Sequence, residues 1–475
     1  MHNNNEMLNA MKIPVVSLFS GAGGLDNGFF MNGSYDIVLA LDKDRSAAET
    51  YSKNHSFKMP QISDADGYAR HTFLVEDIKN INMGGVGFSN PEVVIGGPPC
   101  QDFSIIRGPP SERRGIKVER GRLYAYFVKA LIRLNPYTFV FENVPGLAYQ
   151  NGGASYKVIK DDFSNLTSKV EKIEEIAGNG FSGSPIGYEL LFSGSVDSSA
   201  FGVPQKRHRL IILGVRRDLI EELKVDLNHL KASVKNSLIP RNSLLFKFPI
   251  SAMEAFEGRS LPELEEQYKD IIEEWKSNLS KASIRRWTSN GQNFTGDIMS
   301  DYLRSNNVNS YTKVELEESW EEHKRILMEL KYYGSPLNEN SYFEDGSNIL
   351  PDEADIVKRR MKRIPPGENY SFVDNTSLQV KGNDISVVYR RLHPLKPSYT
   401  VLAGGGGGTH GYHYLFERSG LTNRERARLQ SFSDSFKFNG TKTEIRHQIG
   451  EAVPPLVGKA ISEVIAYLHE ILIYG

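Results

Sequence analysis

The fold of this chain is decided by a short run that joins a strand to a rigid loop, Val93-Val94-Ile95-Gly96-Gly97-Pro98-Pro99-Cys100-Gln101-Asp102-Phe103-Ser104. Its first three residues are β-branched and apolar, as a buried central strand requires. The two glycines permit a sharp turn and a close approach to the backbone, and the two prolines stiffen the next positions. Open α/β sheets gather ligands and chemistry just beyond the carboxyl ends of their strands, which is where this run places Cys100.

Cys100 is the only cysteine in the chain. A lone cysteine is commonly a small buried hydrophobe. A core cysteine, however, needs neither the Gly-Gly-Pro-Pro run before it nor the polar Gln-Asp pair after it. A nucleophile must be held still and reachable, in surroundings that favour the thiolate over a thiol whose free pKa is roughly 8.5. We therefore interpret Cys100 as a candidate nucleophile.

The composition is that of a globular protein of two or three domains, because 475 residues exceed the roughly 100–200 residues of one domain. A net charge of −1 does not exclude a nucleic-acid partner, since binding depends on where the charges cluster. One cysteine excludes intrachain disulfides and cysteine-rich zinc sites, and we expect no metal. The chain lacks a long apolar run and a signal-peptide pattern, which predicts a soluble cytoplasmic protein.

A second glycine loop lies near the start of the chain. An apolar strand over 13–19 leads into Ser20-Gly21-Ala22-Gly23-Gly24-Leu25, and a helix follows over about 25–32. Strand, glycine loop and helix start together form a typical ligand-binding turn, although many such loops are only tight turns. The dinucleotide fingerprint G-x-G-x-x-G fails because position 26 is Asp.

Acidic residues end three further predicted strands. Asp42 follows the strand over 37–41, about 20 residues after the glycine loop, where an acid can bind ribose hydroxyls. Asp44 is the natural N-cap of the helix that follows. Asp77 lies just beyond the strand over 72–75, and Glu142 ends the strand that begins at Thr138. From its position alone, Glu142 either caps the next segment or faces a cleft.

A run of cations separates two strands that we expect to form an edge hairpin, over 187–193 and 209–215. This run, Phe201 to Arg209, is either a solvated face or the wall of an anion- or base-binding cleft. Residues from about 151 to 183 have the polar texture of surface helix and loop. The last helix carries an apolar stripe over 457–472, which predicts that it packs back onto the N-terminal sheet.

The segment between Arg217 and Tyr389 has a different character. Its clear helices, over 261–278 and 314–331, are heavily charged. Two separate basic runs, 281–287 and 358–363, are interspersed with aromatic residues. This pattern suits a second domain with irregular loops that bind nucleic acid.

An ordered set of motifs in this chain resembles the motifs of the C5-cytosine DNA methyltransferases. The resemblance covers both ends of the chain, in the family's order and approximate spacing. The matching runs are Leu18-Phe19-Ser20-Gly21-Ala22-Gly23-Gly24-Leu25, Pro99-Cys100-Gln101, Glu142-Asn143-Val144, Gln205-x-Arg207-x-Arg209, Arg391-Leu392 through Pro397-Ser398-Tyr399-Thr400-Val401, and Gly450 to Pro455.

The resemblance implies an α/β fold with a Rossmann-like S-adenosylmethionine-dependent methyltransferase sheet and a smaller, irregular target-recognition domain. The catalytic domain would cover 1–217, completed by a C-terminal helix over 446–475, and the target-recognition domain would cover 218–445. The cofactor would be S-adenosylmethionine, with Phe19 stacked on its adenine and Asp42 on its ribose hydroxyls. The full set of implied cofactor residues is Phe19, Gly21, Ala22, Gly24, Leu25, Asp42, Lys43, Asp77, Ile78, Pro98, Leu123, Ala452 and Val453.

The implied chemistry explains why these residue types are needed. Cytosine C5 is a poor nucleophile until the Cys100 thiolate adds to C6. Glu142 would hold or protonate N3, Arg209 would bind O2, and Arg207 would help to fix the loop and the charge. The target base must leave the helix, and the loop over 103–122 is our candidate for a lid that closes over it.

The implied partner is double-stranded DNA, possibly with a cognate restriction endonuclease that acts separately. We expect a monomer, since flipping one base needs no dimer. The alternatives are a tRNA cytosine-5 methyltransferase, a catalytically silent DNA-binding homologue, and a nicotinamide oxidoreductase, which the failed fingerprint disfavours. The recognised DNA sequence cannot be read from the chain.

Two departures from the family pattern stand out. Ser17 occupies a position where the family often has Asp, and Glu451 a position where Asn is usual. A carboxylate at position 451 would lie near the methionine end of the cofactor and repel its carboxylate. We therefore expect Glu451 either to weaken cofactor binding or to turn towards the cofactor's amino group.

Overall fold

The computed structural model describes residues 12–60, 69–81, 91–99, 123–177, 185–223, 226–380, 387–404, 409 and 411–474. They belong to two compact units. The first unit comprises Met1–Asp197, His208–Pro240 and Val457–Gly475, and the second comprises Ser198–Arg207 and Arg241–Leu456. Residues 218–240 thus lie in the first unit, and residues 446–456 lie in the second. No helix within the described ranges is long and apolar enough to cross a membrane.

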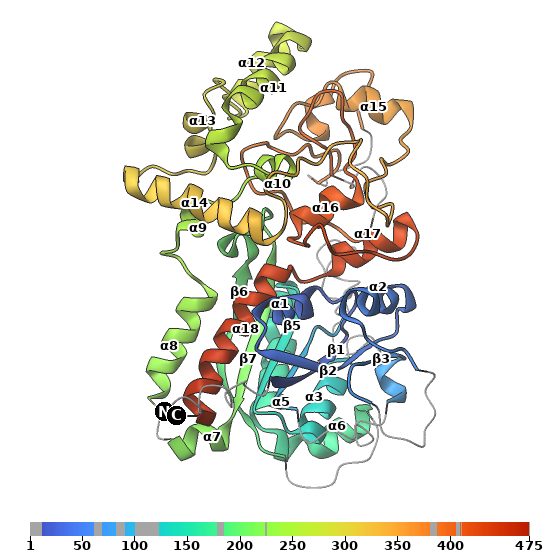
Figure 1. Ribbon diagram of the computed structural model, residues 1–475, viewed down its shortest axis with the longest axis vertical. Coiled ribbons are helices and arrows are strands. Elements are labelled where there is room, and N and C mark those ends of the chain that lie inside the picture. The colour runs from blue at the N-terminus through green and yellow to red at the C-terminus, as the bar shows by residue number, and fades with distance from the viewer. Residues whose placement is uncertain are drawn as a thin grey trace, which may run out of the picture. The chain divides into compact units, whose positions relative to one another are not determined.

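The first unit is built on a seven-stranded sheet of order β3-β2-β1-β4-β5-β7-β6 (Figure 1). Its strands are β1 (Ile13–Leu18), β2 (Tyr35–Asp42), β3 (Thr72–Val75), β4 (Val93–Gly96), β5 (Thr138–Asn143), β6 (Tyr188–Asp197) and β7 (His208–Arg216). The first five are parallel, whereas β7 runs antiparallel to β5, and β6 runs antiparallel to β7. The predicted α/β sheet and its edge hairpin are both confirmed.

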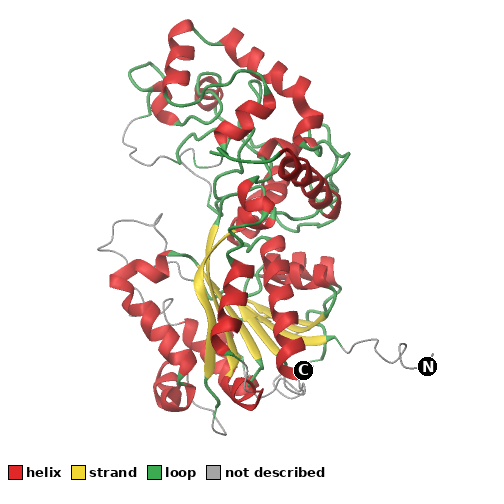
Figure 2. Cartoon of the chain, turned by 90° about the vertical axis from the view of Figure 1, so that its left-hand side faces the viewer, coloured by secondary structure: helices red, strands yellow, loops and turns green. Residues whose placement is uncertain are grey.

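Helices pack on both sides of this sheet (Figure 2). They are α1 (Gly24–Asn32), α2 (Arg45–His55), α3 (Leu123–Leu134), α4 (Gly146–Tyr149), α5 (Ala154–Ser164), α6 (Val170–Ala177), α7 (Arg217–Leu223), α8 (Leu227–Leu238) and most of α18 (Pro455–His469). Phe163 of α5 packs on Phe139 of β5, with ring centroids 4.7 Å apart. The expectation of surface helix over 151–183 agrees with α5, which exposes a polar face and packs Ile159 and Phe163 into the core.

The last helix returns to the first unit, as its apolar stripe predicted. The Tyr35 hydroxyl of β2 donates to the Ser462 carbonyl of α18 over 2.5 Å. A side chain at Gly458 would collide with the carbonyl of Leu25, so α18 and α1 approach closely through a glycine. Figure 1 shows the two helices side by side. Distant parts of the sequence thus complete one core.

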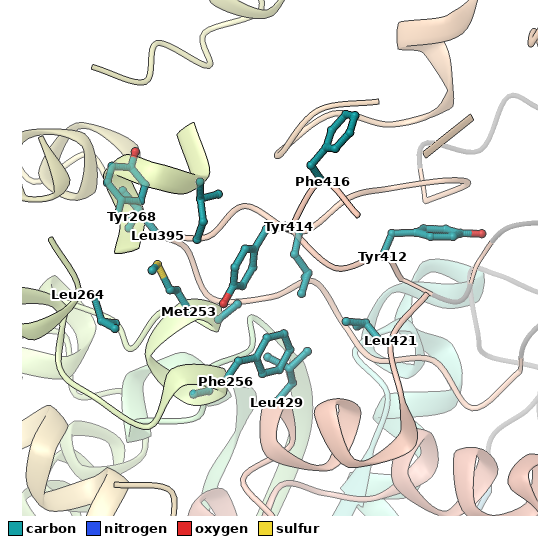
Figure 3. Packing of buried hydrophobic residues seen from close by; sticks show 14 of the residues in the cluster. Met253, Phe256, Leu264, Tyr268, Leu395, Tyr412, Tyr414, Phe416, Leu421 and Leu429 are labelled. Atoms are coloured by element: carbon teal, nitrogen blue, oxygen red, sulfur yellow. The ribbon is translucent and has the colours of Figure 1, made fainter. Parts of the chain in front are cut away.

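The second unit is helical, and among its described residues no strand forms. Its helices are α9 (Leu244–Lys247), α10 (Ala252–Glu257), α11 (Glu265–Asn278), α12 (Lys281–Ser289), α13 (Ile298–Ser305), α14 (Lys313–Glu329), α15 (Asp355–Met361), α16 (Asn423–Leu429) and α17 (Lys442–Glu451). Figure 3 shows part of the apolar core, where Phe256, Tyr414 and Leu429 gather from distant segments.

Buried arginines organise the loops of this second unit. Five of them are almost inaccessible to solvent: Arg207, Arg391, Arg424, Arg426 and Arg428. Arg391 donates to the carbonyls of Met361, His413, Leu415 and Arg418. Carbonyls in irregular backbone have no strand partner, and a buried carbonyl without a donor is costly. The guanidinium groups therefore satisfy the backbone where a sheet would otherwise do so.

Replacing Arg391 by Met should destabilise the second unit by about 3 kcal/mol or more. Each buried carbonyl that loses its hydrogen-bond donor costs about 1–3 kcal/mol. Urea unfolding of the full chain measures this loss. The matched control is Arg359→Met on α15, where the arginine is exposed and has no recorded partner among the described residues. Its effect should stay within about 0.5 kcal/mol. Equal losses in the two variants would contradict the role given to Arg391.

Candidate active site

Two glycines, one at the end of β4 and one just after it, allow close approaches to their backbone. A Cβ at Gly96 would lie 2.5 Å from the Leu18 carbonyl oxygen of the neighbouring strand β1. A Cβ at Gly97 would lie 2.5 Å from the Glu142 Oε2 atom. An added Cβ would force the β1 backbone to move at Gly96 and the Glu142 carboxylate to move at Gly97. The Glu142 carboxylate therefore lies directly against the backbone of Gly97.

The end of strand β5 also holds the next part of the loop. The Asn143 side chain donates from Nδ2 to the Pro98 carbonyl over 3.1 Å and accepts the Val144 amide at Oδ1 over 2.8 Å. Asn143 therefore holds both the loop after β4 and the segment after β5. The predicted nucleophile Cys100 and the predicted lid over 103–122 lie outside the described residues, which on this loop end at Pro99.

Glu142 and Arg209, two predicted catalytic residues, form an ion pair. The Arg209 Nε atom lies 2.8 Å from the Glu142 Oε1 atom, and each side chain is only 12% exposed. Strand pairing causes this contact, because β5 and β7 are neighbours and Glu142 lies opposite Ile211. A charge-assisted hydrogen bond in such a shielded place is strong and directional. It fixes one carboxylate oxygen on Arg209 and leaves Oε2 over Gly97.

Arg207, the third predicted catalytic residue of the described chain, lies in the second unit and is 1% exposed. It donates from Nη1 to the Val401 carbonyl over 2.9 Å and from Nη2 to the Gly450 carbonyl over 2.7 Å. These contacts tie the Arg207 segment to both of the C-terminal motif runs. His208, by contrast, is half exposed, so the cationic run is neither uniformly solvated nor uniformly buried.

Gln205 is a residue whose role the sequence did not reveal. It is fully buried and accepts the Val401 amide over 2.7 Å, while its Nε2 atom donates to the Gln430 Oε1 atom over 2.7 Å. Gln430 in turn donates to the Ile449 carbonyl over 2.6 Å. The only available signal was the place of Gln205 at the head of the Gln205-x-Arg207-x-Arg209 run.

The predicted cofactor residues of the first unit follow the ends of adjacent strands. Phe19 follows β1, Asp42 ends β2, Asp77 lies just past β3, and Pro98 lies just past β4, and these four strands are neighbours in the sheet. Because the strands are parallel, these residues share one edge of the sheet. Lys43 is exposed, whereas five further predicted cofactor residues are buried, namely Ala22, Gly24, Leu25, Ile78 and Leu123.

Asp42 and the glycine loop are in direct contact. The Gly21 amide donates to the Asp42 Oδ2 atom over 2.9 Å, and the Asp44 amide donates to Oδ1 over 2.9 Å. Asp44 caps α2 by accepting the Ala47 amide, so the capping prediction is confirmed for Asp44. Asp42 is only partly buried, and its carboxylate bridges the glycine loop and the start of α2.

The remaining cofactor positions lie in the second unit. Ala452 and Val453 follow α17, and the Ala452 amide donates to the Gln448 carbonyl. Glu451 is about half exposed, and its Oε1 atom lies 3.1 Å from the His447 Nε2 atom, one helical turn away. In this structure the Glu451 carboxylate thus has a partner within α17.

The sequence pattern of the C-5 cytosine-specific DNA methylases matches residues 13–466. The chain therefore belongs to that family of DNA (cytosine-5-)-methyltransferases. It is 47% identical over 458 residues to DNA (cytosine-5-)-methyltransferase M.ApeKI of Aeropyrum pernix, covering 95% of this chain and 97% of the relative. It is 30% identical over 446 residues to the type II methyltransferase M.NgoFVII of Neisseria gonorrhoeae, covering 94% and 84%.

The fold also has a counterpart among solved structures. A prophage-encoded protein from E. coli, described as a DNA modification methyltransferase, superposes with a TM-score of 0.54. The two share 21% sequence identity, and the match covers 96% of this chain and 99% of the other. This likeness supports the mixed sheet with one antiparallel hairpin described above.

Replacing Gly97 by Ala should push the Glu142 carboxylate away from its place and lower activity by about 100-fold, the effect of a misplacement of about 1 Å. The methylation rate of the purified protein measures this effect. Gly194→Ala in β6 is the control, since its Cβ would meet only the tip of the Phe192 ring at 3.1 Å. Full activity of Gly97→Ala would show that Glu142 needs no fixed position.

Proposed function

We propose that this enzyme transfers the methyl group of S-adenosylmethionine to C5 of a flipped cytosine within a short, specific sequence of double-stranded DNA. The observation that carries the proposal is the Glu142 carboxylate, paired with Arg209 at 2.8 Å and seated on the backbone of Gly97. An acid and a cation thus lie beside Gly97, three positions before Cys100 in the sequence. A cytosine ring needs both groups when a thiolate adds to it.

The proposed reaction begins with the Cys100 thiolate forming a bond to cytosine C6. Electron density then moves into the ring, and Glu142 stabilises it by holding or donating a proton at N3. Arg209 stabilises the negative charge at O2 and keeps Glu142 oriented. C5 would then gain the methyl group as the bond between that group and the donor's sulfur breaks, which leaves the neutral thioether S-adenosylhomocysteine. Water would remove the C5 proton, the bond between C6 and the cysteine sulfur would break to restore the Cys100 thiolate, and a proton given to N3 would return to Glu142.

The cofactor-binding part of the proposal relies on the first glycine loop. When bound, S-adenosylmethionine supplies an electrophilic methyl group. Asp42 would accept its ribose hydroxyls, and the contact of Asp42 with the Gly21 amide places acid and loop side by side. Phe19 would stack on the adenine, with Asp77 and Ile78 at its edge.

We assign DNA reading to the second unit. Basic side chains on its helices suit phosphate contacts, and Lys358, Arg359 and Arg363 of the α15 region are exposed. Specificity would come from its irregular loops, held by the buried arginines. We further propose a monomer acting on DNA in the cytoplasm, in a restriction-modification setting with a separate endonuclease.

The decisive experiment is conversion-based sequencing for 5-methylcytosine on DNA from cells that express the wild type or Cys100→Ser. Methylation at one short motif, present only with the wild type, is the expected result. It would establish the reaction, the substrate and the recognised sequence together. No difference between the two strains would overturn the proposal for DNA. Parallel sequencing of tRNA would then test the RNA alternative.

Glu142→Gln should lower kcat by about 100- to 1000-fold, because the amide keeps the shape but can neither carry the charge that pairs with Arg209 nor donate an acidic proton. Single-turnover kinetics at saturating DNA and cofactor measure the change. The control is Glu189→Gln, which removes a carboxylate of the same sheet, on β6, that pairs with Lys231 of α8. An unchanged kcat for Glu142→Gln would remove Glu142 from the mechanism.

A further inference from the structure

A buried carboxylate lies beneath the first glycine loop. Asp26, in the first turn of α1, is 1% exposed. The Ser17 hydroxyl, at the end of β1, donates to it and lies 2.7 Å from Oδ1 and 3.0 Å from Oδ2. A buried carboxylate is expensive unless hydrogen bonds compensate it. The burial of Asp26 beneath the first glycine loop therefore indicates that its hydrogen bonds stabilise this loop.

The hydrogen bonds of Ser17 continue into the loop. The Ser20 hydroxyl lies 2.9 Å from the Ser17 hydroxyl, and the Leu41 amide donates to the Ser20 hydroxyl over 3.2 Å. The Ser20 hydroxyl also lies 3.1 Å from the Ser17 carbonyl oxygen, so two acceptors of Ser17 compete for its one proton. When that proton points to the nearer Ser17 hydroxyl, the donors run in one direction, from β2 through Ser20 and Ser17 to Asp26. Each donor in such a chain strengthens the next one, and the carboxylate is the acceptor at its end.

The loop above this chain of hydrogen bonds has a demanding backbone. Phe19, Gly21 and Gly23 all have positive φ angles, of 57°, 53° and 85°. Positive φ is costly for Phe19, which is not a glycine, so the surroundings must impose it. On one side Asp42 holds the Gly21 amide. On the other side the Ser20 side chain links the loop to Ser17 and Asp26.

The other groups around Asp26 do not replace this link. The Tyr51 ring packs under Gly23, where a Cβ would lie 2.6 Å from Tyr51 Cδ2. The Tyr51 hydroxyl is buried beside Asp26 but makes no hydrogen bond of ordinary geometry among the described residues. Burial raises the pKa of Asp26 to about 7, partly offset by the Ser17 hydroxyl and by Tyr51. Ser17 is thus the main hydrogen-bond partner of this carboxyl group.

We propose that Asp26 is a positioning residue, which sets the shape of the cofactor loop through Ser17 and Ser20. This chain has Ser17 where the family often has Asp, and Asp26 supplies a carboxylate from α1 instead. The inference rests on the proposed cofactor role of this loop. The inference predicts that an aspartate at position 17 can take over from Asp26, since side chains at both positions reach the same buried space.

The test compares the full-length variants Asp26→Ser, Asp26→Asn and the exchange Ser17→Asp/Asp26→Ser. Calorimetry should show S-adenosylmethionine binding weakened about tenfold in both single variants, the scale of one hydrogen bond. The exchange variant should recover most of that loss. The KM for the cofactor should rise, while kcat at saturating cofactor stays within about threefold of the wild type.

A matched control separates positioning from stability. Asp162 of α5 is also a fully buried carboxylate, paired with Lys172 and Tyr124 on the same unit. Asp162→Ser should lower the unfolding temperature without weakening cofactor binding. Amide hydrogen exchange of residues 20–24, without cofactor, should speed up in Asp26→Asn and not in Asp162→Ser.

Two results would overturn the inference. The first is wild-type cofactor affinity and wild-type exchange in folded Asp26→Asn. The second is an exchange variant that folds but stays as weak as Asp26→Ser. Absence of cofactor binding by the wild type would instead reject the proposed function, while the hydrogen-exchange comparison would still decide whether Asp26 shapes the loop.

Discussion

The contact on which the site depends is the one between the Glu142 carboxylate, the Arg209 guanidinium and the backbone of Gly97. Each partner comes from a different strand end, on β5, β7 and the loop after β4. The antiparallel strand β7 matters here because it brings a cation beside an acid on a parallel strand. The mixed sheet is thus the means by which acid and cation meet next to the predicted nucleophile loop.

The two units differ in how the amides and carbonyls of their buried backbone find hydrogen-bond partners. In the first, strand pairing satisfies the amides and carbonyls, and glycines allow close approach. In the second, guanidinium groups bind carbonyls from several loops at once, as Arg391 and Arg428 do. Loops held in this way can vary in sequence at their tips while their bases stay fixed. That property suits a surface that must read a particular DNA sequence.

Local patterns were enough to predict the strands, the glycine loops and the cap at Asp44, because each depends on neighbouring residues. The role of Glu142 was left open, since only pairing with Arg209 across two strands distinguishes a cap from a site residue. Arg207 posed the same difficulty, because its carbonyl partners lie 194 and 243 positions away. In the sequence, Asp26 was noted only because it interrupts the dinucleotide fingerprint, since its burial against Ser17 depends on the packing of α1 on β1.

The return of α18 to the first sheet has a consequence for how the protein is made. Ribosomes build chains from the N-terminus, so strands β1 to β7 and the whole second unit emerge before this helix does. Until then Tyr35 lacks its Ser462 partner and α1 lacks its close neighbour. A nascent or prematurely ended chain thus carries every predicted site residue on an unfinished core. The predicted active-site residues are therefore made before the core that holds them can form, and a working enzyme requires that α18 has been synthesised.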